Sequence, residues 1–202
     1  TTIDDPEAYF QVKTYTGNGT DDTDITLGAE EDMQPDMIWF KERGGAETPA
    51  LFDSPRGVHN RLFPSTSDAE AAATNSLQAF LSDGWTMGVN DQLNTNTDTY
   101  VAWCWKANGS GSSNTAGSIN TTATSANTTS GFSISTYTGT GSAATIGHGL
   151  GAVPDVVIVK GRTIAASWRM YHSANNNTDY MTLSTTDYVV TSGSNWNDTT
   201  PT

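Results

Sequence analysis

The sequence predicts an all-β fold of two tandem antiparallel β-sandwich domains, jelly-roll or immunoglobulin-like, of which the second is incomplete. Three observations lead to this prediction. Gly, Ser, Thr and Asn are abundant while strong helix formers are sparse, a composition typical of strands and turns. Short apolar runs, alternating or continuous, are separated by turn-forming residues. One stretch of the sequence also occurs twice, about 120 residues apart, a far longer period than that of solenoids or propellers.

The repeat is a domain duplication. Residues 10–19 align with residues 132–141, because both read Phe-x-x-x-Thr-Tyr-Thr-Gly-x-Gly. Residues 35–41 align with residues 154–160, since both begin with Pro-Asp, continue as an apolar run and end in Lys. The predicted organisation is a first sandwich over residues 1–107, a Gly/Ser/Asn linker over residues 108–117 and a second sandwich over residues 118–202.

The first copy opens with a half-buried strand. Residues 9–16 alternate in polarity, and the Gly-rich residues 16–19 supply a tight turn. Residues 23–27 are predicted to pair back as the hairpin partner of this strand, with Ile25 and Leu27 facing inward.

A continuous apolar run over residues 37–40 predicts a strand buried on both faces. Its counterpart, residues 156–159, contains only β-branched residues, which favours a strand over a helix. Both are predicted to be the central strands of their sheets. A further strand is expected over residues 50–53 and, in the second copy, over residues 168–171.

The remainder of the first copy contains one helix signal. Ser67 followed by Glu70 fits a capping box, so residues 67–73 are expected to form at most a short peripheral helix. Beyond it, the sequence predicts a strand at residues 85–87, a polar loop at residues 90–98 and a closing strand at residues 100–105.

The linker is expected to be flexible, and weak alternation from Ser118 onward predicts an edge strand that opens the second domain. The second copy ends near the position equivalent to Asp83, so it lacks counterparts of residues 84–88 and 100–105. A sheet without its closing strands exposes unpaired edges. We therefore expect the chain to be a segment of a longer polypeptide, or to be completed by a partner.

Charge and cysteine content exclude several classes of protein. The formal net charge is -13, with only 9 Lys and Arg residues. Nucleic acids and anionic membranes both require clustered cations, so neither is an expected partner. No apolar run reaches the roughly 18 to 20 residues that span a bilayer, so no membrane insertion is expected. Cys104 is the only cysteine, which excludes a disulfide framework and predicts a small core residue.

Acidic residues on two loops suggest a calcium site. Hard oxygen ligands on flexible loops suit Ca²⁺, provided that the two loops meet at one end of the first sandwich. A solvated acidic rim is the favoured alternative, because no known calcium-loop spacing is present. No other cofactor is expected. The candidate ligands are Asp21, Asp22, Asp24, Glu30, Glu31 and Asp32.

Two kinds of side chain are candidates for binding a ligand. Lys and Arg recur at the same place in both copies, although such residues more often end a strand and pair with nearby acids. Exposed Trp rings stack on sugars, although Trp in strands usually fills a sandwich core. The resulting candidates are Lys41, Arg43, Lys160, Arg162 and Trp196.

No catalytic residues are predicted. His59, His148 and His172 lack His or Cys partners at metal-ligand spacing, and no Gly-x-Ser-x-Gly motif occurs. A glycosidase needs two carboxylates roughly 5 to 9 Å apart, and the sequence identifies no such pair. Asp36 and Asp155 recur after Pro at turn positions, where an Asp side chain caps the backbone. The chain is therefore predicted not to be an enzyme.

The order of motifs resembles a β-sandwich domain of unknown function. The motifs are Tyr-Thr-Gly-x-Gly (15–19), Pro-Asp with a strand ending Lys-x-Arg (35–43), Leu-Phe-Asp-Ser-x-Arg-Gly (51–57), Asp-Gly-Trp (83–85) and Tyr-Val-Ala-Trp-Cys-Trp-Lys (100–106). That domain is found in tandem in predicted tail-fibre or other virion proteins of bacteriophages, notably marine ones. The resemblance covers nearly the whole chain, and it implies a virion-associated structural or adhesive role with no known catalytic residue to carry over.

The expected function is that of a non-enzymatic virion protein, such as a phage tail fibre, spike or capsid decoration protein, which presents loops for host attachment. The expected location is the virion or the extracellular space. Expected partners are other virion subunits, further copies of the chain in a homo-oligomer, and a host-surface glycan. A secreted or cell-surface carbohydrate-binding module is the alternative, and a polysaccharide-degrading enzyme is the third reading.

Overall fold

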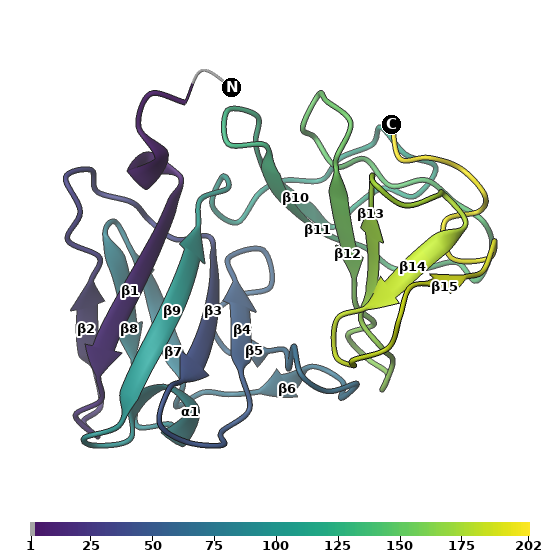
Figure 1. Ribbon diagram of the computed structural model, residues 1–202. Coiled ribbons are helices and arrows are strands. Elements are labelled where there is room, and N and C mark those ends of the chain that lie inside the picture. Colours follow the sequence, from purple (N-terminus) through teal and green to yellow (C-terminus); the bar gives the residue numbers. More distant parts are fainter. Residues whose placement is uncertain (1–2) are drawn as a thin grey trace.

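The first half of the chain forms a two-layered antiparallel β-sandwich. The computed structural model describes residues 3–202. One layer is a four-stranded sheet in the order β1-β9-β3-β4, and the other is a three-stranded sheet in the order β2-β8-β7 (Figure 1). The first layer contains β1 (Phe10–Thr16), β9 (Thr99–Trp105), β3 (Met37–Glu42) and β4 (Ala50–Asp53); the second contains β2 (Thr23–Thr26), β8 (Gly84–Met87) and β7 (Leu77–Leu81).

Small elements complete this half, namely the 3-10 helix η1 (Pro6–Ala8), the α-helix α1 (Asp91–Asn94) and the paired strands β5 (Asn60–Arg61) and β6 (Ala71–Ala72). Among residues 3–202, no helix has the length and apolar character needed to cross a membrane. The predicted all-β fold class is confirmed.

Large apolar side chains fill the space between the two layers. Ile38 and Phe40 of β3 lie in the same fully buried cluster as Trp85 and Met87 of β8. The rings of Phe40 and Trp85 meet edge to face, with 5.3 Å between their centroids. Strand β3 is central, as predicted, but only one of its faces is fully buried, because Trp39 and its neighbours on the outer face are half-buried.

Cys104 lies in this core and yields a testable prediction. It is fully buried on β9, and burial raises the pKa of its thiol. Because the thiolate is the reactive form, we expect a thiol reagent at pH 8 to label the native protein at least about 100-fold more slowly than the urea-unfolded protein. A spectrophotometric thiol assay measures both rates, and equal rates would contradict the burial of this residue.

The hairpin predicted for residues 23–27 is wrong. Strand β2 crosses to the second layer and pairs with β8, placing Ile25 opposite Trp85. The inward placement of Ile25 and Leu27 is correct, since Leu27 is buried and Ile25 packs on the core. Strand β1 pairs along all seven of its residues with β9 instead. That ladder is longer than the four-residue β2 allows, so the distant strand is preferred over the neighbouring one.

The helix predicted for residues 67–73 is absent. Residues 67–70 have no regular secondary structure and lead into β6. The carboxylate of Glu70 does not return to the backbone of Ser67 but binds Arg56 and Arg162. Hydrogen bonds from two guanidinium groups, in which donor and acceptor are both charged, are stronger than the single backbone N–H bond of a capping box, so the non-helical conformation is favoured.

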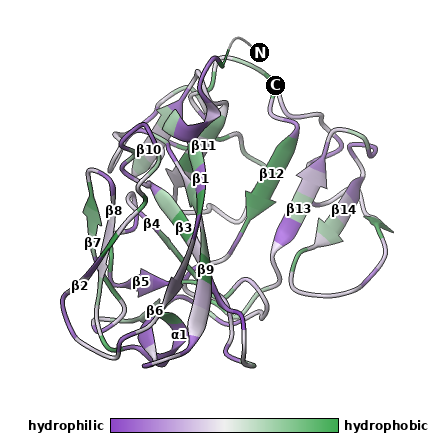
Figure 2. Cartoon of the chain, turned by 60° about the vertical axis from the view of Figure 1, so that its left-hand side comes forward, coloured by the Kyte–Doolittle hydropathy of each residue, from purple (hydrophilic) through white to green (hydrophobic). Residues whose placement is uncertain are grey.

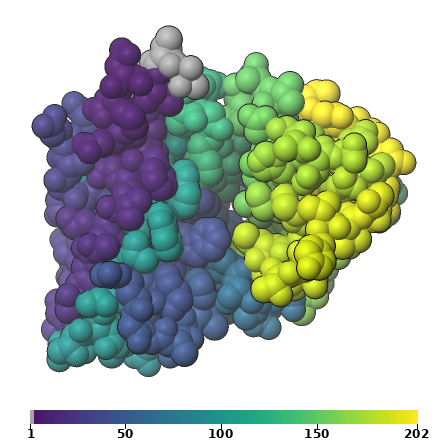
Figure 3. Space-filling view, viewed as in Figure 1, coloured from purple at the N-terminus to yellow at the C-terminus, as the bar shows by residue number. Residues whose placement is uncertain are grey.

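The second half contains six strands in two sheets, one with the order β10-β11 and the other with the order β12-β13-β14-β15. Figure 3 shows this half, green to yellow, alongside the first. Its strands are β10 (Ala123–Asn127), β11 (Phe132–Thr136), β12 (Val156–Val159), β13 (Arg169–His172), β14 (Asp179–Thr182) and β15 (Val190–Thr191).

The duplication extends to the register of the strands. Strand β3 pairs with β4 so that residue 37 faces residue 53, and β12 pairs with β13 so that residue 156 faces residue 172. In the same way, residues 60 and 72 face each other in β5 and β6, and residues 179 and 191 face each other in β14 and β15. Each position is shifted by the same 119 residues, as from 37 to 156. The strand pairs that both copies contain therefore have the same register.

Strand β12 lies at a sheet edge, so the prediction that it is a central strand is wrong. Strand β3 has β9 on one side and β4 on the other, whereas β12 has only β13 beside it. Val156 and Ile158 on β12 are 43% and 45% exposed. The reason is that no strand within residues 3–202 takes the place that β9 holds in the first half.

The linker predicted over residues 108–117 is held in place rather than free. The N–H of Asn108 donates to Oγ of Ser125 at 2.7 Å, and the N–H of Gly109 donates to Asp36 at 3.1 Å. Ser112 forms a bridge with Thr124 further along. Its backbone groups thus find partners on both halves of the chain, which removes the flexibility that its composition suggested. The regular edge strand begins at Ala123 rather than near Ser118.

Candidate functional site

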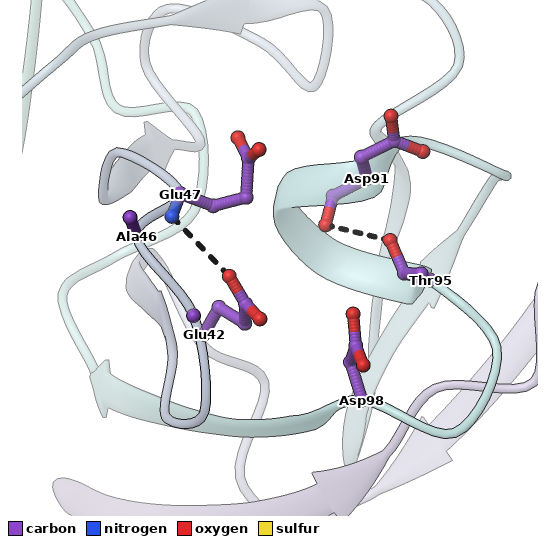
Figure 4. A pocket seen from close by; sticks show the side chains of 7 residues that line it. Glu42, Ala46, Glu47, Asp91, Thr95 and Asp98 are labelled. Atoms are coloured by element: carbon purple, nitrogen blue, oxygen red, sulfur yellow. Dashed lines mark hydrogen bonds between the residues drawn. The ribbon is translucent and has the colours of Figure 1, made fainter.

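Four carboxylate side chains surround an open hollow at one end of the first sandwich (Figure 4). They come from the end of β3, from the loop that follows it, from α1 and from the turn before β9. The hollow has a volume of about 470 Å³, and its lining residues are Glu42, Gly45, Ala46, Glu47, Asp91, Thr95 and Asp98.

Hydrogen bonds within the loops shape this hollow. The carboxylate of Glu42 accepts a bond from the N–H of Glu47 at 3.2 Å. Nζ of Lys41 donates to the carbonyl oxygens of Glu42 (2.6 Å) and Gly45 (3.2 Å), which closes the loop after β3. On the opposite side, the hydroxyl of Tyr100 donates to the carbonyl of Asp91 at 2.7 Å. The loop after β3 and the start of α1 are therefore both held by hydrogen bonds between side chains and backbone groups.

The electrostatic environment of the hollow is negative. Burial is the main cause that raises the pKa of Tyr100, hydrogen bonding with Thr95 opposes it, and the carboxylates of Asp98 and Glu42 raise it further. Carboxylates in such a place accept hydrogen bonds from hydroxyl groups or attract cationic groups of a partner. Within residues 3–202, no group of three or more His, Cys, Asp or Glu residues is placed to hold a metal ion.

No sequence pattern predicted this hollow. Asp91 and Asp98 lie in the stretch predicted as a polar loop, about fifty positions away from Glu42 and Glu47. Only the packing of α1 beside β3 brings the two stretches together. No residue spacing encodes that contact.

The two acidic loops predicted as a calcium site do not meet. Asp21 precedes β2 and Glu31 follows it, so the loops leave opposite ends of that strand. The carboxylate of Asp21 accepts a bond from Gln78 (2.8 Å), whereas the carbonyl of Glu31 accepts one from Gln11 at the start of β1. The premise that Asp21, Asp22 and Asp24 converge with Glu30, Glu31 and Asp32 is therefore wrong.

The recurring cations occupy different environments in the two copies. Lys41 folds back onto its own loop, and Arg43 is exposed. In the second copy, Nζ of Lys160 donates to the carbonyls of Gly161 (2.9 Å) and Ser67 (3.3 Å). Arg162 donates two bonds to Glu70. The predicted ligand-binding residues Lys160 and Arg162 thus make contacts between the two halves of the chain.

Glu70 is the centre of this contact between the halves. Its carboxylate lies 3.0 Å from Nη1 of Arg56 in the first half and 2.7 Å from Nη2 of Arg162 in the second. Its N–H donates to the carbonyl of Arg162 at 2.8 Å, and Nε1 of Trp168 donates to the carbonyl of Phe63 at 2.9 Å. Burial by itself would raise the pKa of Glu70, but the bonds from Arg162 and Arg56 outweigh it and hold that pKa below its ordinary value.

The lowered pKa of Glu70 predicts a pH-dependent stability. A carboxylate whose pKa is lower in the folded state contributes stability that is fully present above its unfolded pKa of about 4.3 and is lost as the pH falls through the folded value. We therefore expect the free energy of unfolding of Glu70→Gln to depend less on pH below about pH 5 than that of the wild type. Urea unfolding at several pH values, followed by Trp fluorescence, measures this dependence.

The control for this experiment is Glu31→Gln, because Glu31 is an exposed carboxylate. It should retain the pH dependence of the wild type. If Glu70→Gln and the wild type lose stability equally on acidification, Glu70 does not stabilise the fold through its charge.

Trp196, predicted as the exposed aromatic residue, is half-buried. Its Nε1 donates to the carbonyl of Asp179 at 2.8 Å, and its ring meets Tyr171 edge to face at 5.8 Å between centroids. The ring of Tyr188 in this half is 93% exposed, and no sequence motif marks it.

Comparison with known proteins gives one match. The model of a family described as a domain of unknown function (DUF7483) matches residues 5–202. No curated protein and no solved structure matches the chain.

Proposed function

The chain belongs to the DUF7483 family, a domain of unknown function, and we propose that it is a non-enzymatic structural and adhesive module of a virion. In this role it forms part of a tail fibre, a spike or a capsid decoration protein. Its partners are other virion subunits or further copies of the chain, and the site of action is the virion surface. The motif order described above, which resembles tandem domains of predicted phage fibre proteins, supports this assignment.

The observation that carries the proposal is the docking of one repeat unit on the next. The second copy contacts the first through the Glu70–Arg162 ion pair and through the indole of Trp168. The linker between the copies is also hydrogen-bonded to Asp36 of the first copy. Units joined by such contacts form a stiff series, which suits a protein that holds its loops away from a particle. The acidic hollow around Glu42 and Asp98 lies among those loops. Weak contacts made by many copies then add through multivalency.

The test is immunogold electron microscopy of the particles or cells that carry the chain, with an antibody raised against residues 1–202. Label on tail tips, fibres or the capsid is the expected result, and the position of the label distinguishes a fibre from a decoration protein. Label confined to cell surfaces would overturn the virion assignment.

A carbohydrate-binding module is the second candidate, and the exposed ring of Tyr188 favours it. An aromatic ring stacked on a sugar contributes enough binding energy that Tyr188→Ala would weaken glycan binding by about tenfold. Tyr137→Ala is the matched control, because Tyr137 is only 39% exposed. Titration of both variants against host-surface glycans measures the difference, and equal affinities would remove Tyr188 from the binding surface.

A further inference from the structure

The free edge of β12 lies where the first half of the chain holds a strand. In the first half, β9 lies between β1 and β3 and pairs with both. Strands β11 and β12 are the counterparts of β1 and β3, but they belong to separate sheets. We propose that the free edge of β12 binds a β-strand from outside residues 3–202, and that this strand carries the uncharged, alternating aromatic pattern of β9. This inference is independent of the proposed function.

Backbone N–H and C=O groups of β12 point toward the side on which such a strand would lie. In the first half, the N–H of Arg43 donates to the carbonyl of Thr99 at 2.7 Å. Since successive residues of an antiparallel strand turn to opposite sides, Met37 and Trp39 also turn their N–H and C=O groups toward β9. Val156 and Ile158 are their equivalents in register. Their N–H and C=O groups therefore point to the free edge, and no partner for them exists within residues 3–202.

The side chains along β12 are also uncovered. Ile38 and Phe40 of β3 are fully buried, but their equivalents Val157 and Val159 are only half-buried. Val156 and Ile158 are exposed, and Figure 2 shows β12 as hydrophobic along its length. Natural proteins protect an exposed hydrophobic edge strand, because it is a template for pairing with another chain. In the first half, β9 protects the equivalent edge of β3 by pairing with it.

The sequence of β9 explains which strand fits. On one face of β9, Ala102 and Cys104 are small and fully buried. On the other, Trp103 meets Trp39 at 6.4 Å between ring centroids. Transferred to the second half, Trp103 of the incoming strand lies opposite Ile158, the equivalent of Trp39. Because β9 contains no acidic side chain, a strand like it also avoids repulsion by a chain of net charge -13.

Pairing along a free edge is the common mode by which sheets bind extended peptides. Main-chain hydrogen bonds supply the affinity, and alternate side chains supply the specificity. The test therefore uses a fluorescein-labelled peptide with the sequence of residues 98–107 and the substitution Cys104→Ser. Fluorescence anisotropy measures its binding to the chain of residues 1–202, and amide hydrogen exchange locates the site. We expect saturable binding and exchange at Val156 and Ile158 slowed by at least about tenfold.

One position of β12 offers a matched pair of variants. Ile158→Pro removes the N–H that faces the free edge without removing a bond to β13, a position where a sheet tolerates Pro. Peptide binding is expected to weaken by about tenfold or more. Ile158→Thr keeps the N–H and a β-branched side chain, so its affinity is expected to stay within about threefold of the wild type. Circular dichroism confirms that both variants fold.

Three outcomes would overturn the proposal. The first is equal binding of a peptide with the same residues in scrambled order. The second is unchanged exchange at Val156 and Ile158 when the peptide is present, which decides the matter even if Ile158→Pro does not fold. The third is a dimer of the unliganded chain that Ile158→Pro converts to a monomer in light scattering, because the occupant would then be a second copy of the chain.

Discussion

Asp36→Ala is expected to lower the free energy of unfolding by about 3 kcal/mol, because it leaves buried donors without an acceptor. Asp36 is fully buried. Its carboxylate accepts bonds from the N–H of Ala107 at 2.8 Å and the N–H of Gly109 at 3.1 Å, as well as from Oγ of Ser54 at 3.1 Å. One side chain thus fixes the end of β9, the start of the linker and the turn after β4. Urea unfolding at pH 7, followed by Trp fluorescence and circular dichroism, measures the loss.

The duplication supplies the control for this prediction. Asp155 occupies the equivalent position in the second copy, but it is exposed, and its carboxylate accepts a bond from Oγ of Ser173 at 2.7 Å. Asp155→Ala is therefore expected to lower the free energy of unfolding by only about 0.5 kcal/mol. Similar losses for the two variants would show that the contacts of Asp36 with Ala107 and Gly109 do not determine stability.

Arg56→Ala is expected to cost about 3 to 5 kcal/mol, the range for breaking a buried ion pair by removing one partner. The side chain of Arg56 is 3% exposed and binds Asp53 at 2.7 Å and Glu70 at 3.0 Å. It also donates to the carbonyl of Asn60 at 2.7 Å. Removal of the guanidinium leaves Asp53 buried without a cation and deprives Glu70 of one of its two. Thermal and urea unfolding of the variant measure the effect.

Arg162→Ala is the matched control, since Arg162 binds the same carboxylate from the second half. Its side chain is 40% exposed, so solvent screens the pair and the expected loss is about 1 kcal/mol or less. This variant is also expected to loosen the contact between the halves, which limited proteolysis of residues 108–117 detects. If Arg162→Ala destabilises the protein as much as Arg56→Ala, burial is not what sets the strength of this network.

Arg56 and Arg162 have different roles in the cluster of charged residues around Glu70. Arg56 belongs to the first sandwich and pairs with the acids Asp53 and Glu70 there. Arg162 comes from the second copy and donates to both carboxylate oxygens of Glu70, one of which also accepts a bond from Arg56. The equivalents of Glu70 and Arg56 in the second copy are Val189 and Asn175. Within residues 3–202 this charged contact is therefore present once, although the strands around it are duplicated.

Sequence patterns alone predict the all-β class, the duplication, the position of most strands and the burial of Cys104. These features follow from local alternation of apolar residues and from a repeat long enough to be unambiguous. Strand β7 was not predicted, because apolar and polar residues do not clearly alternate from Leu77 to Leu81.

Which strands pair depends on contacts between distant segments of the chain, and this pairing forms every site described above. Strand β1 pairs with β9 from the far end of the first copy rather than with β2. Strand β12 is an edge strand, because no strand within residues 3–202 takes the place beside it that β9 holds beside β3. Glu70 binds two arginines instead of capping a helix, and four carboxylates from separate segments meet in one hollow. The physical reason is common to all of them. A strand or a carboxylate gains its stabilising contacts from residues distant in the chain, and no local sequence pattern encodes which distant residues those are.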